Sequence, residues 1–106
     1  MRELPHRNEV NMYCSVIDIE IQPGRFEQAK AQANAMIPEY HELGCKQFIL
    51  VDKGNDSFTV IAIYESQAKQ AEATPKAQEL LGRLAEMMKT PPERKGAEII
   101  INQVYG

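Results

Sequence analysis

The segment that decides the fold reads Ile17-Asp18-Ile19-Glu20-Ile21-Gln22-Pro23-Gly24-Arg25-Phe26. Its isoleucines alternate with acidic residues, which places the isoleucines on one face of a strand and the acids on the other. Pro23 and Gly24 then interrupt the extended chain. We therefore expect a strand over residues 10–21, followed by a turn.

Downstream of the turn, residues 25–42 change to a helical period. Their apolar residues recur every three or four positions, which predicts one buried helical face. These residues are Phe26, Ala29, Ala33, Ile37 and Tyr40. Pro38 should kink or tighten the last turn, because proline removes a backbone hydrogen bond, and Gly44 should end the helix.

The second half of the chain repeats the order of strand and helix. Strands are predicted over 45–53 and 57–65, joined as an antiparallel hairpin by Lys53-Gly54-Asn55-Asp56. Ser66 is typical of an N-cap. Thr74-Pro75 predicts a second helix start, and so a short helix over 67–73, a break, and a longer helix over 75–89. The last strand is predicted over 97–105.

This order predicts one α+β domain over residues 10–106 with a ferredoxin-like β-α-β-β-α-β fold, preceded by an arm over residues 1–9. The right-handed crossover rule places both helices on one face of a four-stranded antiparallel sheet. The other face is apolar too, since Val16, Ile61 and Ile63 alternate with helix-facing residues. We therefore expect a second copy to cover it, giving a homodimer packed sheet to sheet.

Composition excludes several classes of protein. The 106 residues are 43% hydrophobic and 25% charged, with a net charge of −3 and scattered lysines and arginines. A nucleic-acid partner is therefore not expected, and neither is a membrane partner, because no apolar run approaches the roughly 20 residues of a span. The polar start does not resemble a secretory signal. Cys14 and Cys45 have no motif partner, which favours reduced thiols in the cytoplasm.

Three segments resemble the antibiotic biosynthesis monooxygenase domain of the dimeric α+β barrel superfamily. The first is the turn quoted above, and the others are Leu43-Gly44-Cys45 and Ile61-Ala62-Ile63-Tyr64-Glu65-Ser66. With the alanine-rich start of the second helix, the resemblance covers residues 10–105. It implies a sheet-to-sheet dimer in which each subunit holds a flat aromatic molecule between its sheet and helices. It also implies oxygenation without metal or flavin in some members, and heme degradation in others.

Heme degradation does not carry over to this chain. The heme-degrading branch has asparagine where this chain has Ile17, tryptophan where it has Tyr64, and histidine near Pro75. No cofactor is therefore expected. No metal is expected either, because His6 and His41 lie far apart in the sequence without a cluster of acids.

Cofactor-free oxygenation of a phenol needs a pocket and a group that favours the phenol's anion. Tyr13, Ser15, Ile17 and Tyr64 should lie on the cleft face of the sheet and bind the substrate, although buried core side chains with satisfied hydroxyls would give the same pattern. Tyr64 and His41 are the candidate catalytic residues. A solvated histidine at a helix end is the alternative interpretation of His41.

Other residues are weaker candidates. Asp18 and Glu20 form either a buried acid pair at the dimer centre or a solvated strand end.

The leading hypothesis is a monooxygenase-like protein that acts on or binds a small aromatic or quinone-type molecule. A non-catalytic dimeric binding or interaction module is the alternative, and an isomerase or cyclase of polyketide-like intermediates is a third.

Overall fold

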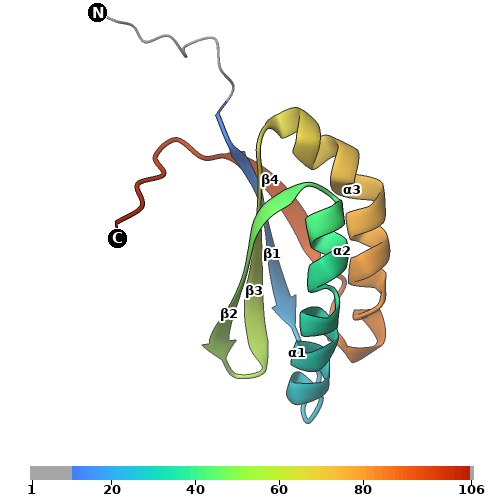
Figure 1. Ribbon diagram of the computed structural model, residues 1–106. Helices are drawn as coiled ribbons and strands as arrows, with labels where there is room; N and C mark the ends of the chain where they lie inside the picture. Colours follow the sequence, from blue (N-terminus) through green and yellow to red (C-terminus); the bar gives the residue numbers. More distant parts are fainter. Residues whose placement is uncertain (1–10, 106) are drawn as a thin grey trace, which may run out of the picture.

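The computed structural model describes residues 11–105 and confirms the ferredoxin-like α+β fold (Figure 1). A four-stranded antiparallel sheet has the strand order β2-β3-β1-β4, and all helices pack on one of its faces. The strands are β1 (Tyr13–Glu20), β2 (Cys45–Gly54), β3 (Ser57–Tyr64) and β4 (Glu93–Glu98). The helices are α1 (Phe26–Ala35), α2 (Ile37–Glu42) and α3 (Gln67–Gly82), followed by the 3-10 turn η2 (Ala85–Met87). The predicted arm over residues 1–9 lies outside the described residues.

The core lies between the sheet and the helices. Ile17, Ile19 and Ile21 are at most 1% exposed, as the alternation of β1 predicts. In the register of the sheet, Ile17 pairs with Val60 and Ile19 with Phe58, so the apolar residues of two strands form one continuous face. Apolar residues of α3 and of the chain beyond it are also buried against this face. They are Ala77, Leu80, Leu81, Leu84, Met87 and Met88.

The first predicted helix is two helices. α1 ends at Ala35 and α2 begins at Ile37, so the break lies before Pro38 rather than in the last turn. Proline has no N–H to donate to the carbonyl four residues earlier, but it fits the first turn of a new helix, where that N–H has no partner. The break turns Ile37 outward, and 43% of this residue is exposed.

The predicted break at Thr74-Pro75 is wrong, because α3 runs through Pro75 without interruption. The Thr74 hydroxyl is not a cap. It donates a hydrogen bond to the Gln70 carbonyl at 3.1 Å, one turn back in the same helix. The single true N-cap of α3 is Ser66, whose hydroxyl accepts a hydrogen bond from the Lys69 N–H at 3.2 Å.

The last strand was predicted over residues 97–105, but it lies earlier in the chain. β4 begins directly after Pro92 and ends at Glu98. Glu98 pairs with Tyr13, the first residue of β1, so the sheet offers almost no further partner to the chain beyond it. Residues 99–105 therefore leave the body of the domain, although they carry more β-branched side chains than β4 itself (Figure 1).

The hairpin between β2 and β3 is confirmed. Asn55 and Asp56 connect the strands with φ angles of 54° and 58°. A positive φ at both central residues is the geometry of a type I′ turn, which matches the twist of antiparallel strands. Asparagine and aspartate are the residues other than glycine that adopt it most readily.

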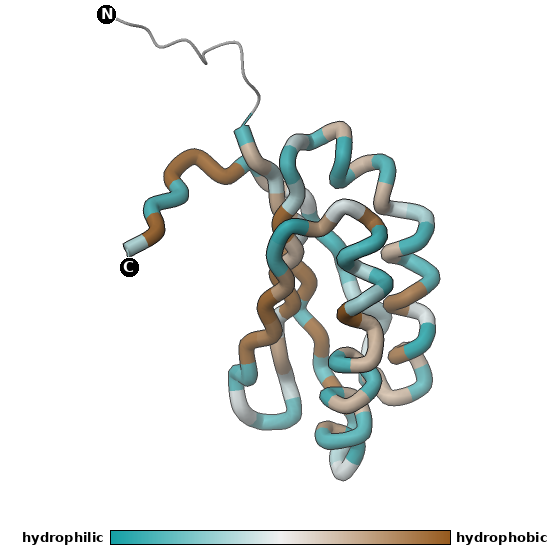
Figure 2. Tube along the Cα trace, in the orientation of Figure 1, coloured by the Kyte–Doolittle hydropathy of each residue, from teal (hydrophilic) through white to brown (hydrophobic). Residues whose placement is uncertain are grey.

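No described helix covers the second face of the sheet, here called the open face (Figure 1). Its apolar side chains are half-buried or exposed rather than buried. They are Cys14, Val16, Ile49, Val51, Ile61 and Ile63. The segment 99–105 beyond β4 is also apolar, and its residues Ile100, Ile101, Val104 and Tyr105 are 79–88% exposed (Figure 2).

Candidate functional site

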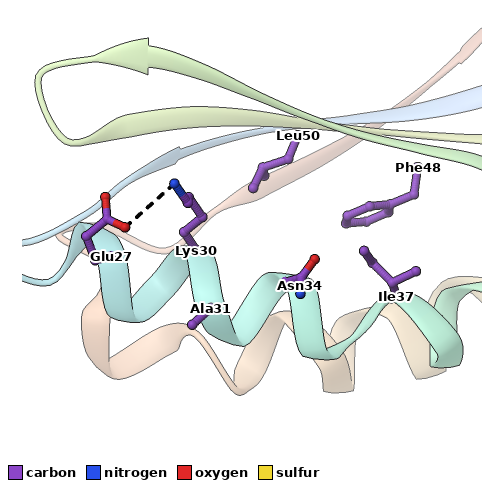
Figure 3. A pocket seen from close by; sticks show the side chains of 7 residues that line it. All are labelled: Glu27, Lys30, Ala31, Asn34, Ile37, Phe48 and Leu50. Atoms are coloured by element: carbon purple, nitrogen blue, oxygen red, sulfur yellow. Dashed lines mark ion pairs between the residues drawn. The ribbon is translucent and has the colours of Figure 1, made fainter.

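A hollow of about 380 Å³ lies between α1 and β2, on the helix side of the sheet (Figure 3). Phe48 and Leu50 form its sheet wall, because they pair with the helix-facing Ala62 and Val60. Ile37 closes it at the helix break. Its complete lining is Glu27, Lys30, Ala31, Asn34, Ile37, Phe48 and Leu50. We call it the α1–β2 hollow.

The α1–β2 hollow has apolar walls and a charged rim. Glu27 and Lys30 lie at one end, where the carboxylate and the ammonium are 3.6 Å apart (Figure 3). Behind the hollow, the Tyr40 ring packs on Phe48 with centroids 4.7 Å apart and planes tilted by 42°. Such paired rings provide a flat surface against which an aromatic molecule packs well. Tyr40 itself is only 1% exposed.

Polar side chains cross the interior behind Tyr40. We call Ser15, Tyr40, Tyr64 and Arg94 the donor cluster. Each has at least one buried polar atom without a hydrogen-bond partner among the described residues: the three hydroxyls, and Nε and Nη2 of Arg94. The remaining guanidinium nitrogen, Nη1, donates to the Thr74 hydroxyl at 2.7 Å.

The two buried tyrosines remain protonated at neutral pH. Burial raises the pKa of Tyr40 to about 12, and the neighbouring Tyr64 acts in the same direction. Burial also raises the pKa of Tyr64, although Arg94 and Ser15 lie close enough to lower it in part. That proximity falls short of a well-formed hydrogen bond, because the Tyr64 hydroxyl has no partner of good geometry. As neutral phenols, both side chains can donate a hydrogen bond to a ligand.

The structure brings four of the predicted site residues together on the helix-facing side of the sheet. Ser15, Ile17 and Tyr64 are each 0% exposed. The ring of Tyr13 lies over the backbone of Gly96, so close that a side-chain carbon on this glycine would come within 2.8 Å of the ring. These residues fill the interior rather than line the α1–β2 hollow, whose walls come from α1, the helix break and β2.

His41 is placed differently from the other predicted residues. It lies on the exposed side of α2, next to the buried Tyr40. It lines a second, smaller hollow of about 210 Å³ on the other side of Phe48 and Ile37. The structure therefore places His41 at the surface and Tyr64 in the interior.

Sequence reasoning missed Arg94, Tyr40 and Phe48 as site residues. Arg94 belongs to the charged run Glu93-Arg94-Lys95, which is typical of a solvated surface. Only the register of β4 reveals its direction, because Arg94 pairs with the buried Ile17.

The acidic and thiol groups of the described residues form no metal site. No three His, Cys, Asp or Glu side chains in residues 11–105 are grouped as metal ligands would be. Asp18 lies at the edge of the open face, where its carboxylate accepts from Thr59 at 2.7 Å and Lys53 at 3.0 Å. These hydrogen bonds, followed by the charge of Lys53, lower its pKa.

Cys14 and Cys45 are free thiols. No helix in the described part of the chain is long and apolar enough to cross a bilayer.

Comparison with known proteins agrees with this architecture. No protein-family model matches the sequence, and no curated protein matches it. Among solved structures, a protein of unknown function from Nitrosomonas europaea superposes with a TM-score of 0.76 at 16% identity, covering 92% of this chain and 98% of that one.

Two further structures carry functional descriptions. A candidate antibiotic biosynthesis monooxygenase from Bordetella bronchiseptica has a TM-score of 0.73 at 18% identity, with 86% and 99% of the two chains covered. A variant of SnoaB, a cofactor-independent oxygenase from Streptomyces nogalater, has a TM-score of 0.72 at 11% identity, with 88% and 97% covered. These identities establish the fold alone. The chain thus has the fold of the antibiotic biosynthesis monooxygenases, as its sequence resemblance predicts.

Proposed function

We propose that this protein is a cofactor-independent monooxygenase-like protein that acts on or binds a small aromatic or quinone-type molecule. The α1–β2 hollow carries this proposal. Its volume of about 380 Å³ lies in the range of small-molecule sites, and its apolar walls include an aromatic ring backed by a second ring. The fold that the chain shares with SnoaB supports the reaction type by analogy.

Oxygenation of a phenol without a cofactor requires few protein groups. A phenol that has lost its proton can itself supply electrons to dioxygen, so the protein has to bind the ring and stabilise the anion. Tyr64 lies in the interior outside the lining of the hollow, and burial raises its pKa, so we assign it as a neutral hydrogen-bond donor behind the hollow rather than as the base. The base would be His41, which lies at the surface beside the same Phe48 wall and within reach of solvent.

The open face favours a second candidate function, a dimeric binding or interaction module without turnover. Val16, Ile61 and Ile63 are apolar and only half-buried in one chain, and a second copy would cover them by packing sheet against sheet. The free thiols Cys14 and Cys45 are suited to the reducing cytoplasm, which we propose as the location. The dimer is common to both functions, so oligomeric state alone does not separate them.

Binding is the first test. Isothermal titration calorimetry with 1-naphthol and with a naphthohydroquinone should show saturable binding that Phe48→Ala weakens by roughly tenfold, since a buried aromatic contact is lost. Val51→Ala is the matched control, because Val51 lies on the same strand but on the open face. Equal binding by wild type and Phe48→Ala would exclude the α1–β2 hollow as the site.

Turnover is the second test. An oxygen electrode should record uptake with the responsive hydroquinone, and His41→Ala and Tyr64→Phe should slow it. Binding without oxygen uptake across the series would favour the binding module. Uptake unchanged in both variants would show that the roles assigned to His41 and Tyr64 are wrong.

A further inference from the structure

Segment 99–105 has the character of a strand but no strand partner in the described part of the chain. It contains no charged residue, glycine or proline, and its β-branched residues favour an extended conformation. Ile99 donates a backbone hydrogen bond to the Met12 carbonyl at 2.9 Å, and residues 100–105 make no backbone hydrogen bond to the described body of the domain. Four large side chains are 79–88% exposed, namely Ile100, Ile101, Val104 and Tyr105. An uncovered apolar stretch of this kind indicates pairing with another chain.

The outer edge of β2 has a matching character. β2 is the outermost strand on its side of the sheet, and among the described strands it pairs only with β3. Residues 47–52 pair with β3 in regular register and contain neither proline nor lysine, the two residues that usually protect an edge. Lys46 and Lys53 flank them. An extended chain that adds to this edge can therefore bond to its outward row of backbone groups.

The opposite edge of the sheet is protected by charge. β4 is the outermost strand there, and most of its residues are charged, namely Glu93, Arg94, Lys95 and Glu98. Charged side chains on an edge strand disfavour pairing with a further strand. The apolar edge of β2 is therefore the better acceptor for segment 99–105.

Segment 99–105 cannot lie along β2 of its own chain. It follows β4, and three strand spacings separate β4 from β2, a distance of about 14 Å. The extended segment spans about 23 Å, so crossing the end of the sheet would use more than half of it. Figure 1 shows the segment running away from the helices instead. A second copy carries the same segment and the same edge, so the exchange is reciprocal and closes after two chains.

The free edge of β2 is also an open side of the α1–β2 hollow. Phe48 and Leu50 are only half-buried, and 43% of Ile37 is exposed, so the apolar wall is incomplete in one chain. Pockets for small molecules usually enclose about 70–90% of the ligand surface. Every second residue of an added strand would lie on the helix side, next to this wall. Both alternating sets of segment 99–105 contain isoleucine, so either register extends the wall with an apolar side chain.

We propose that segment 99–105 of a second copy pairs with the free edge of β2 and completes the wall of the α1–β2 hollow. The candidate ligand site is then shared between two chains, and each copy supplies one wall to the other. The role of the segment in ligand binding rests on the proposed function. Its pairing with β2 rests only on the exposed segment and the free edge.

Hydrogen exchange followed by NMR tests the pairing. Alternate N–H groups of a strand point to opposite sides, so half of the amides of residues 47–52 face the free edge. We expect these outward amides to be protected in the wild type. Ile100→Pro and Ile101→Pro form a matched pair, because only one of two neighbouring N–H groups can bond to β2. One variant should remove the protection and the other should keep it. Equal behaviour of the two variants, or unprotected outward amides in the wild type, would overturn the pairing.

Mixing two full-length variants tests whether the site is shared. The disruptive proline variant keeps Phe48 but lacks a working segment, whereas Phe48→Ala keeps the segment but lacks the aromatic wall. Each variant alone should bind 1-naphthol roughly tenfold more weakly than the wild type in calorimetry. In a mixed dimer, the intact hollow of one copy receives the intact segment of the other. An equimolar mixture should therefore regain wild-type affinity in about one hollow in four.

Phe48→Ala mixed with Ile37→Ala is the control, because both changes lie in the wall of the hollow and no mixed dimer contains an intact one. Recovery in the first mixture alone supports the shared site. No recovery, or 1-naphthol binding that neither proline variant weakens, overturns the shared site and leaves the proposed function intact. A wild type that binds no 1-naphthol although the outward amides of β2 are protected overturns the proposed function and leaves the pairing intact.

Discussion

Gly96 of β4 lies directly against the ring of Tyr13. A side-chain carbon at this position would lie 2.8 Å from Cε2 of Tyr13 and 3.2 Å from Nε2 of Gln70. We predict that Gly96→Ala lowers the free energy of unfolding by about 1 to 3 kcal/mol, the usual cost of overpacking. Urea denaturation followed by circular dichroism measures the change.

Gly82 provides the control for this prediction. A side-chain carbon there meets nothing within 4 Å, so Gly82→Ala should leave stability unchanged or raise it slightly. Tyr13→Leu should partly rescue Gly96→Ala, since it removes the ring that causes the clash. Gly96→Ala as stable as wild type would mean that the Tyr13 ring lies elsewhere.

At the residue scale, the sequence predicts which side chains of β1 face the helices, but it does not predict that Arg94 of β4 lies beside them. The alternation of Ile17, Ile19 and Ile21 determines the direction of Ser15, which is why that residue was found. Arg94 could not be found in this way, because the residues around it are charged on both faces and give no period. Its burial depends on the pairing of two strands far apart in the sequence, which no local pattern encodes.

At the scale of elements, α3 contains an exposed proline in its interior. Pro75 cannot donate to the carbonyl four residues earlier, and it is exposed rather than packed in the core. We predict that Pro75→Ala raises the free energy of unfolding by roughly 2 kcal/mol, the helix propensity difference less the entropy that proline removes from the unfolded chain. A thermal melt should show a higher Tm, and an unchanged or lower Tm would contradict the prediction.

The contact between α2 and α3 depends on pH. Arg83 donates to both carboxylate oxygens of Glu39, at 2.6 and 3.1 Å, and these hydrogen bonds lower the pKa of Glu39 below its ordinary 4.5. A lowered folded pKa means that the stabilisation is present above pH 4.5 and is lost as the pH falls through the lowered value. Glu39→Gln should therefore lower Tm at pH 7 and make a smaller difference at pH 3.

A matched control for this pair is Glu27→Gln, which removes an exposed acid 3.6 Å from Lys30 within a single helix. Exposed pairs of this kind contribute little to stability, so its melting curve should follow that of the wild type at both pH values. A Glu39→Gln deficit that does not shrink with acid would show that the carboxylate acts through packing rather than charge.

Most elements were predicted because their signals are local. The Asn55-Asp56 turn and the Ser66 cap are each decided within a few residues, so they appear in the sequence directly. The prediction placed the last strand too far along the chain, because the β-branched residues 99–105 have the higher strand propensity. The strand forms over 93–98 instead, because those residues lie opposite β1 and can pair with it. A segment that can pair with a neighbouring strand becomes the strand, even when its residues have low strand propensity.

At the scale of the whole molecule, the open face predicts self-association. Ile61→Lys places a charge in the middle of this apolar surface, where burial against a second copy would strongly disfavour it. We expect the wild type to sediment as a dimer at micromolar concentration and Ile61→Lys to sediment as a monomer. Analytical ultracentrifugation makes the measurement.

Ala71→Lys is the control, because Ala71 is exposed on α3, away from the open face. This variant should remain dimeric. A wild type that sediments at 12 kDa would contradict the sheet-to-sheet dimer.

The order of pairing in the sheet has a consequence for how the chain folds and opens. β2 and β3 meet across a two-residue turn and need little loop-closure entropy, whereas β1 and β4 join segments as distant as Asn11 and Glu98, 87 residues apart. β4 also has only one neighbouring strand. We therefore expect it to be the last strand secured during folding and the first to exchange its amide protons. Because β4 supplies Arg94, the same local opening would expose the donor cluster to solvent while the hairpin stays closed.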